Sequence, residues 1–269
     1  MNFKLLFPTY RRRFQFVRQV LSRIFDGKPV ARGLNLGSGE GDYDRAIKRY
    51  CKALEACDIN QNDVAFAQHL NRDEPSIHYS VQDGAKLTYL DDSFDFVTCI
   101  DVIEHVPDAK ALLREIHRVL KPGGCLVISC PNHLFPLSYD PINLVLRRVG
   151  LRLRLGAYGY GHTALMRDTQ LEQWLTEAGF KVLSCHYLTK ALAAFSECYW
   201  VSLCQKLFKA NSANQTAAQR RRVALKPSIE EPALVQVTDG LIRLDEWLFG
   251  ASKRSVGLGF VAEKPVKGS

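Results

Sequence analysis

A glycine-rich segment is the part of this sequence whose residue types and spacing are best suited to ligand chemistry. Gly37, Gly39 and Gly41 alternate directly after a short apolar run, so the backbone there can approach a ligand closely. Asp58 follows the next apolar run, where nucleotide-binding folds place the acceptor for ribose hydroxyl groups. The glycines and Asp58 together predict a nucleoside-binding turn.

The charges beside these glycines indicate which nucleoside it would be. A dinucleotide fingerprint reads G-x-G-x-x-G, whereas Asp42 stands here in place of the third glycine. Glu40 and Asp42 would repel a pyrophosphate held against a helix N-terminus, because like charges repel. The same carboxylates would attract a cation. This argues against NAD and for S-adenosylmethionine, whose sulfonium and ammonium groups are both positive.

The elements that must position these residues alternate between strands and helices. Strands are predicted at 34–36, 53–57, 77–81, 94–100 and 125–130, and helices at 42–50, 63–70 and 109–120. This alternation is typical of a doubly wound, mostly parallel α/β sheet. Such a sheet binds ligands at the carboxyl ends of its strands, where Gly37–Gly41, Asp58, Asp83 and Asp101–His105 fall.

The rest of the chain predicts helical additions to this core. Residues 3–25 form a basic amphipathic segment, which either covers the core or lies on a membrane surface. A capping box at Thr169 and Glu172 predicts a helix that ends at Gly179, followed by a strand at 180–184. Apolar helical stretches at 188–208 and 234–250 then precede a last strand at 257–262.

We therefore expect four segments along the chain. They are an N-terminal amphipathic helical segment (1–29), a ligand-binding core (30–185), a helical insertion or lid (186–254), and the last strand with its tail (255–269). The composition does not predict an oligomeric state.

Charge and cysteine content narrow the function classes. The 36 basic and 28 acidic residues give a net charge of +8, with clusters at Arg11–Arg13, 147–154 and Arg220–Arg222. Such clusters are either solvated surfaces or contacts to nucleic acid, anionic lipid or phosphorylated substrates. The 8 cysteines show no metal-ligand spacing, so we expect no metal site and a reduced, cytoplasmic protein. Contact with the inner face of a membrane is compatible with this composition.

As a set, the motifs resemble those of class I S-adenosylmethionine-dependent methyltransferases. They are Gly37-Ser38-Gly39-Glu40-Gly41, Asp58, Gln82-Asp83-Gly84, Phe94-Asp95-Phe96-Val97, Glu104-His105-Val106 and the run from Arg114 to Lys121-Pro122-Gly123-Gly124. The resemblance covers about residues 30–130 and continues more weakly to Ser184. It implies a Rossmann-like sheet of seven strands and S-adenosylmethionine as cofactor.

The resemblance also implies a role for each matched position. The glycine turn, with Ser38 and Glu40, would carry the methionine part of the cofactor. Asp58 would accept from the ribose hydroxyls and Ile59 would pack on the adenine. The remaining positions are Asp83, Gly84 and Ala85 at the adenine, and Asp101 and Val102 at the methionine and the methyl-transfer site. Each also has a structural alternative, since Asp58 could simply end a strand and Asp83 could be an ordinary turn residue.

Methyl transfer mainly requires the protein to align the reactants and exclude water. A hydroxyl acceptor must also lose a proton, and His105 and His162 are the candidate bases, with His133 a further possibility. We expect O- or N-methylation rather than C-methylation, because a carbon nucleophile would also need an acidifying neighbour.

The acceptor is the least determined part of this interpretation. We favour a small-molecule or lipid- or glycan-linked acceptor, in cell-envelope or secondary-metabolite biosynthesis, by analogy of fold. We do not expect a nucleic-acid acceptor, because the basic clusters lack a recognisable RNA-binding module. Cys130-Pro131-Asn132-His133 also differs from the motif of amino-group DNA and RNA methylases. The alternatives are a non-catalytic methyltransferase-like scaffold, an RNA methyltransferase and, third, a dehydrogenase.

Overall fold

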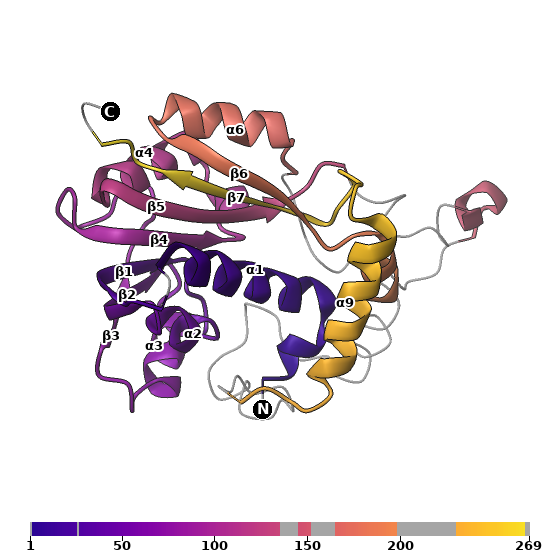
Figure 1. The fold of residues 1–269 in the computed structure, drawn as a ribbon, viewed down its shortest axis with the longest axis horizontal. Coiled ribbons are helices and arrows are strands. Elements are labelled where there is room, and N and C mark those ends of the chain that lie inside the picture. Colours follow the sequence, from indigo (N-terminus) through magenta and orange to yellow (C-terminus); the bar gives the residue numbers. More distant parts are fainter. Residues whose placement is uncertain (1, 26, 135–144, 152–164, 198–229, 267–269) are drawn as a thin grey trace. The chain divides into compact units, whose positions relative to one another are not determined.

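The computed structural model describes residues 2–25, 27–134, 145–151, 165–197 and 230–266 (Figure 1). The chain forms two compact units. The sheet unit comprises Arg13–Pro131, Thr163–His186 and Leu258–Ser269; the α9 unit comprises Met1–Arg12, Asn132–His162 and Tyr187–Gly257. The four-segment division expected from the sequence stays a prediction.

A seven-stranded sheet is the centre of the sheet unit, and its strand order is β3-β2-β1-β4-β5-β7-β6. The strands are β1 (Val30–Leu36), β2 (Cys51–Asp58), β3 (Ile77–Val81), β4 (Phe94–Ile100), β5 (Leu120–Pro131), β6 (Lys181–Leu188) and β7 (Gly257–Glu263). Strands β1 to β5 pair in parallel. β7 runs against β5 (Figure 1), as the bonds from Gly123 N to Lys264 O and from Lys264 N to Gly124 O require. This confirms the expected Rossmann-like fold.

The central strands are buried on both faces, which is why they read as nearly continuous apolar runs. Leu34 and Leu36 of β1 and Phe94, Phe96 and Val97 of β4 are all buried. Five of the described cysteines, Cys51, Cys57, Cys99, Cys125 and Cys130, lie in these strands as buried free thiols. They act as small hydrophobic residues, as their sequence context indicates.

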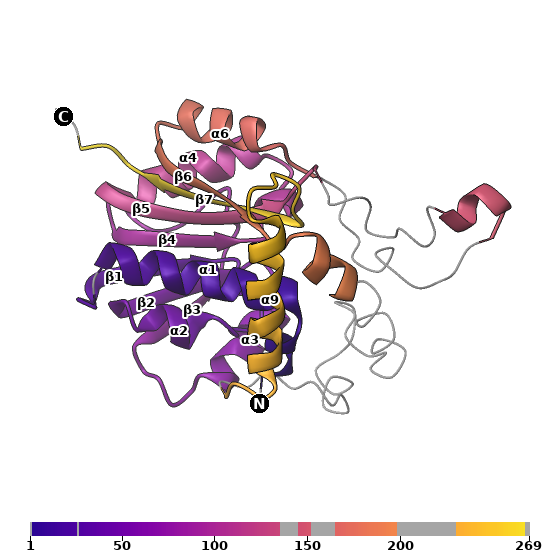
Figure 2. The ribbon, with the colours of Figure 1, turned by 45° about the vertical axis from the view of Figure 1, so that its right-hand side comes forward.

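Helices cover this sheet (Figures 1 and 2). The helices with residues in this unit are α1 (Pro8–Phe25), α2 (Asp44–Lys48), α3 (Gln61–Leu70), α4 (Ala109–Val119) and α6 (Asp168–Glu177). α1 packs on the sheet through Phe16, whose ring lies so close to Gly259 of β7 that a Cβ there would be 2.7 Å from it. Asp108 caps α4 by accepting a hydrogen bond from Ala111 N at 2.9 Å. The part of the basic segment from Arg13 onward therefore covers the core, one of the two roles expected for the segment.

Several expected boundaries differ in the structure, and two of the differences have a local cause. The capping box at Thr169 is wrong: α6 already begins at Asp168, whose Oδ1 accepts from Thr169 N at 2.9 Å, so Thr169 lies inside the helix. The Lys121–Gly124 segment lies between the helix expected at 109–120 and the strand expected at 125–130, and in the structure it belongs to β5, which begins at Leu120. The left-handed conformation of Gly123 (φ +78°) lets the chain turn there, and its N–H joins β7.

The α9 unit is organised around helix α9 (Val235–Phe249), which confirms the helix expected at 234–250. Asp245 of α9 accepts from Lys190 N, Leu192 N and Ala193 N, at 2.6, 2.8 and 3.2 Å. These amides begin the helix over residues 191–197; the stretch expected at 188–208 lies outside the described residues from 198 on. No helix among the described residues is long and apolar enough to cross a bilayer.

Candidate active site

The glycine turn after β1 has the backbone conformation that its sequence predicts. Gly37 and Gly41 have φ angles of +76° and +80°, in the left-handed region that side chains disfavour. A Cβ on Gly37 would lie 2.1 Å from Cγ2 of Val102, and one on Gly41 would lie 2.8 Å from Ala67. The turn is therefore packed against the segment after β4 on one side and against α3 on the other.

Asp58, at the end of β2, holds this turn in place. Its Oδ2 accepts from Gly39 N and its Oδ1 accepts from Asn60 N, both at 2.9 Å. Each carboxylate oxygen keeps a further lone pair for another donor. The next residue, Ile59, is 73% exposed, which is unusual for a large apolar side chain. Asp58 thus has a structural function and still presents acceptor oxygens beside an open apolar surface.

A buried polar network lies next to the glycine turn and bonds to its last residue, Gly41. Asp44 of α2 accepts from Asn35 Nδ2 and from the Tyr79 hydroxyl, both at 2.6 Å. Asn71 donates to the Tyr79 hydroxyl at 2.7 Å and to Gly41 O at 3.4 Å. Burial raises the pKa of Asp44 to about 6, against the hydrogen bonds that lower it. Sequence reasoning missed this network, although Asn35 inside an apolar strand was a signal for it.

The connection after β3 contains the next group of expected residues. Asp83 Oδ1 accepts from Ala85 N at 2.9 Å, so this carboxylate forms the ordinary turn that we considered as its alternative. A Cβ on Gly84 would lie 2.8 Å from Leu112 Cδ1, which places this glycine against α4. The turn leaves the second carboxylate oxygen of Asp83 able to accept another bond.

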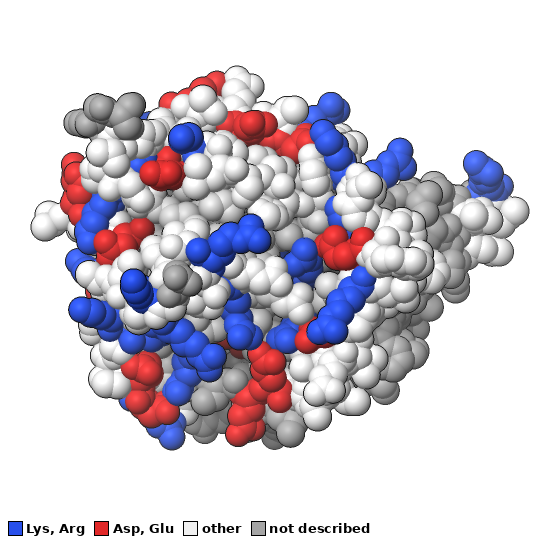
Figure 3. All heavy atoms as spheres, viewed as in Figure 1, with Lys and Arg blue, Asp and Glu red and all other residues white. Residues whose placement is uncertain are grey.

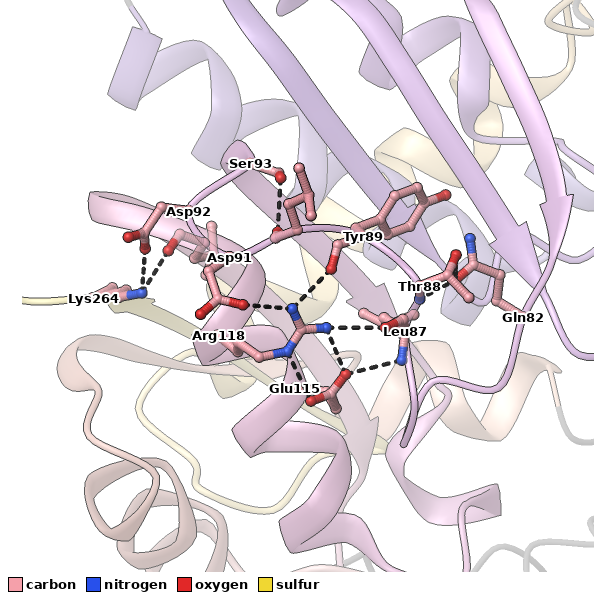
Figure 4. Close-up of polar contacts among 12 residues, drawn as sticks. Gln82, Leu87, Thr88, Tyr89, Asp91, Asp92, Ser93, Glu115, Arg118 and Lys264 are labelled. Carbon is pink, nitrogen blue, oxygen red and sulfur yellow. Dashed lines mark hydrogen bonds and ion pairs between the residues drawn. The ribbon is translucent and has the colours of Figure 1, made fainter.

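Arg118 and Glu115 of α4 fix the chain that follows this turn (Figure 4). Arg118 donates to Leu87 O at 3.0 Å and to Tyr89 O at 2.8 Å, while Glu115 Oε2 accepts from Leu87 N at 2.9 Å. The two side chains also pair with each other at 2.8 Å. This pair, which we call the α4 brace, was not recognised from the sequence. Its signal was the acid and base three residues apart on one helix.

Asp101, the residue directly after β4, has an unusual backbone conformation, with φ +53°. Its carboxylate accepts from Arg13 Nε, at 2.9 Å to Oδ1 and 2.6 Å to Oδ2, and from Ser129 Oγ at 2.9 Å. The Arg13 side chain is buried. The sequence did not predict this ion pair, because Arg13 belongs to a cluster that reads as a basic surface.

The segment after Asp101 combines a buried acid with an exposed base. The Glu104 side chain is 1% exposed, and neither of its oxygens has a hydrogen-bond partner. Burial, and secondarily the charge of Asp101, raises the pKa of Glu104 to about 8. His105 is 58% exposed, with Nε2 3.9 Å from Glu104 Oε1. A buried carboxyl group whose pKa is raised thus lies beside a histidine that solvent can reach.

The structure brings most of the expected residues to one edge of the sheet. The glycine turn, Asp58, Asp83 and Asp101 follow the carboxyl ends of β1, β2, β3 and β4, which are parallel neighbours. His162 lies outside the described residues, and His133 is exposed in the α9 unit. Within the part of the chain that the structure describes, no group of three or more acidic, histidine or cysteine side chains could hold a metal ion.

Comparison with known proteins identifies the family to which this chain belongs. Residues 10–185 match the family described as a methyltransferase domain. The chain belongs to this family. It is a class I methyltransferase that uses S-adenosylmethionine. The methyltransferase therefore has the cofactor that the acidic flanks of its glycine turn indicated.

Curated relatives of the methyltransferase carry out different methyl transfers. A ubiquinone biosynthesis O-methyltransferase of Coxiella burnetii is 27% identical over 172 residues, which cover 64% of this chain and 70% of the relative. One of Xanthomonas campestris is 31% identical over 152 residues, 56% of this chain and 62% of the relative. Phosphoethanolamine N-methyltransferase 2 of Caenorhabditis elegans is 32% identical over 114 residues, 41% of this chain and 26% of the relative.

Solved structures show the same fold with still other chemistry. The phosphoethanolamine N-methyltransferase 2 of Haemonchus contortus, in complex with S-adenosyl-L-methionine, matches with a TM-score of 0.58 and 19% identity, over 94% of this chain and 53% of the other. The [4+2]-cyclase SpnF matches with a TM-score of 0.58 and 18% identity, over 93% and 80%. The fold alone therefore does not determine the acceptor.

Proposed function

We propose that the residues at this edge of the sheet bind S-adenosylmethionine in the order in which the strands present them. Asp58 accepts from the ribose hydroxyls through its remaining lone pairs, and Ile59 packs on the adenine. Asp83, with Gly84 and Ala85, faces the adenine amino group. The exposure of Ile59 supports this assignment, because adenine would cover an apolar side chain that otherwise faces water.

The methionine part of the cofactor lies between the glycine turn and the segment after β4. Ser38 and Glu40, with the backbone of Gly37, Gly39 and Gly41, border it on one side. Asp101 and Val102 border it on the other; the close packing of Val102 on Gly37 supports this arrangement. S-adenosylmethionine supplies a methyl group activated by its positive sulfur, and the acidic side chains here favour that charge.

The reaction is methylation of oxygen or nitrogen on a small-molecule or lipid- or glycan-linked acceptor, in the cytoplasm or at the inner face of a membrane. The observation that carries this proposal is the exposed His105 beside the buried Glu104. In O-methylation, His105 would take the hydroxyl proton while the acceptor oxygen bonds to the methyl carbon and the bond from that carbon to sulfur breaks, which releases S-adenosylhomocysteine. An amine acceptor arrives neutral and needs no such base. The names of the relatives, from ubiquinone and phosphoethanolamine metabolism, support small acceptors.

Calorimetry and methyl transfer test this proposal separately. S-adenosylmethionine and S-adenosylhomocysteine should both bind to the wild-type protein. Transfer of labelled methyl groups is then measured with a prenylated catechol, phosphoethanolamine and bulk tRNA as acceptors. Cofactor binding without transfer to any of them would favour the scaffold alternative, and transfer to tRNA alone would favour an RNA methyltransferase.

Histidine substitutions test the base. With the catechol, His105→Gln should lower kcat by about a hundredfold, the range for a general base, and leave cofactor affinity unchanged. His78→Gln is the matched control, because His78 is 57% exposed and lies on β3. Equal kcat values for His105→Gln and wild type would show that alignment alone drives the reaction.

A further inference from the structure

The outer face of α9 is apolar and unusually exposed. Trp247 is 79% exposed and Val237 is 70% exposed, and Leu244 and Leu248 are exposed as well. Val237, Leu244 and Leu248 are separated by seven and four residues, so they lie on one side of a helix, with Trp247 next to them. Large apolar side chains grouped in this way mark an interaction surface rather than an ordinary helix exterior.

All the acidic residues of α9 are engaged on its other side. Asp239 accepts from Arg11 Nε and Nη2, at 2.8 and 2.9 Å. Glu246 pairs with Arg12 at 3.0 Å. Asp245 is buried and accepts the three backbone bonds from residues 190–193. The outer face of α9 therefore presents no carboxylate.

The exposed charges near the C-terminal half of the outer face are positive. Arg243 is exposed at its edge, and Lys253 and Arg254 are exposed just beyond the end of the helix. On the face of the molecule shown in Figure 3, which has the view of Figure 1 and therefore includes a side of α9, basic and acidic side chains are interspersed. The outer face of α9 thus combines an aromatic residue, aliphatic residues and cations, which is the composition of helices that lie in a membrane interface.

We propose that the outer face of α9 binds an anionic lipid surface. Tryptophan favours the boundary between lipid headgroups and acyl chains, and basic side chains favour anionic headgroups. A second copy of the chain fits less well, because a two-fold contact centred on this face would bring Arg243 near its own counterpart. This inference extends the proposed membrane contact, and it places that contact on α9 rather than on the N-terminal segment or residues 188–208.

Co-sedimentation with lipid vesicles tests the inference without any methyl acceptor, so its outcome is distinct from that of the proposed function. Wild-type protein should pellet with vesicles of phosphatidylcholine and phosphatidylglycerol, and much less with phosphatidylcholine alone. Leu244→Ser/Trp247→Ser should lower the partition coefficient by about tenfold or more, because two buried apolar side chains are lost. Arg243→Gln should lower it about fivefold. Leu90→Ser, at an 80% exposed residue of the sheet unit, should have no effect.

Two further measurements keep the result interpretable. Trp247→Phe should still pellet, but its fluorescence should be quenched less by brominated lipid than that of the wild type. Cofactor affinity of every variant, measured by calorimetry, shows that it is folded. The inference is overturned if the double variant pellets like the wild type, or if light scattering shows a wild-type dimer that Leu244→Ser/Trp247→Ser dissociates while vesicles leave the protein in solution.

Discussion

Glu104 places an acid in the protein interior without a hydrogen bond to compensate it. Burial raises its pKa to about 8, so the folded protein holds a proton that the unfolded chain, with an ordinary glutamate near pH 4.5, releases. Stability from this difference is fully present below about pH 4.5 and is lost as the pH rises toward 8. Glu104 should therefore make the protein less stable in alkaline solution.

Urea denaturation of wild type and Glu104→Gln checks this prediction. Glutamine does not titrate, so we expect the wild-type free energy of unfolding, relative to that of the variant, to fall between pH 5 and pH 8. The slope should reach at most about 1.4 kcal/mol per pH unit. A difference that stays constant over this range would show that Glu104 is ionised in the folded protein.

Asp58 combines a structural bond with a proposed ligand bond, so its replacement should affect both. In Asp58→Asn the amide can accept from only one of Gly39 N and Asn60 N, which should lower the free energy of unfolding by about 1–2 kcal/mol. Loss of a charged acceptor for the ribose should weaken S-adenosylmethionine binding by about a hundredfold. Thermal denaturation and calorimetry measure the two effects. Reduced stability with unchanged affinity would leave Asp58 only its structural function.

At the scale of elements, the α4 brace connects a helix to the proposed adenine site. Arg118→Ala removes the bonds to Leu87 O and Tyr89 O and the ion pair with Glu115, which keeps only its bond from Leu87 N. We expect a free energy of unfolding lower by about 2–3 kcal/mol and faster amide exchange at Ala85 and Leu87. KM for S-adenosylmethionine should rise while kcat stays nearly constant, because the brace is remote from the methyl-transfer site.

Arg114→Ala is the matched control for the α4 brace. It lies on the same helix, but it pairs with Asp108 at 3.7 Å, and both side chains are about three-fifths exposed. Such exposed pairs contribute only about 0–1 kcal/mol. Equal effects of the two substitutions on KM would mean that the helix as a whole, rather than the brace, positions Asp83–Ala85.

The elements also show which features a sequence can reveal. The bounds of β3 and β4 and the conformation of the glycine turn were predicted correctly, because local periodicity and glycine chemistry decide them. The Arg13–Asp101 pair was not, since 88 residues separate its members and nothing local distinguishes Arg13 from a surface arginine. The same holds for Asp44 and Tyr79. Long-range polar pairs depend on the folded arrangement, and only their unusual residue types signal them in advance.

At the scale of the whole molecule, the cluster Arg11–Arg13 reads from the sequence as a basic surface, but in the structure its arginines form ion pairs. Arg11 and Arg12 pair with acids of α9 within one unit, and Arg13 pairs with Asp101 within the other. Arg11 and Arg13 are buried, so neither is open to nucleic acid or lipid. The net charge of +8 therefore overestimates the positive charge that the N-terminal end of the chain offers to a partner.

The effect of salt concentration should distinguish the buried ion pairs from the exposed cations. Buried ion pairs are screened little by mobile ions, whereas attraction between exposed cations and an anionic surface is screened strongly. Between about 50 and about 500 mM NaCl, where the Debye length falls from about 14 to about 4 Å, Tm should change by only a few degrees. Pelleting with phosphatidylglycerol vesicles should fall steeply over the same range, and Arg243→Gln should reduce that salt dependence. If Tm instead falls in parallel with pelleting, salt screens the Arg11 and Arg12 pairs strongly, and these pairs are solvated rather than protected from water.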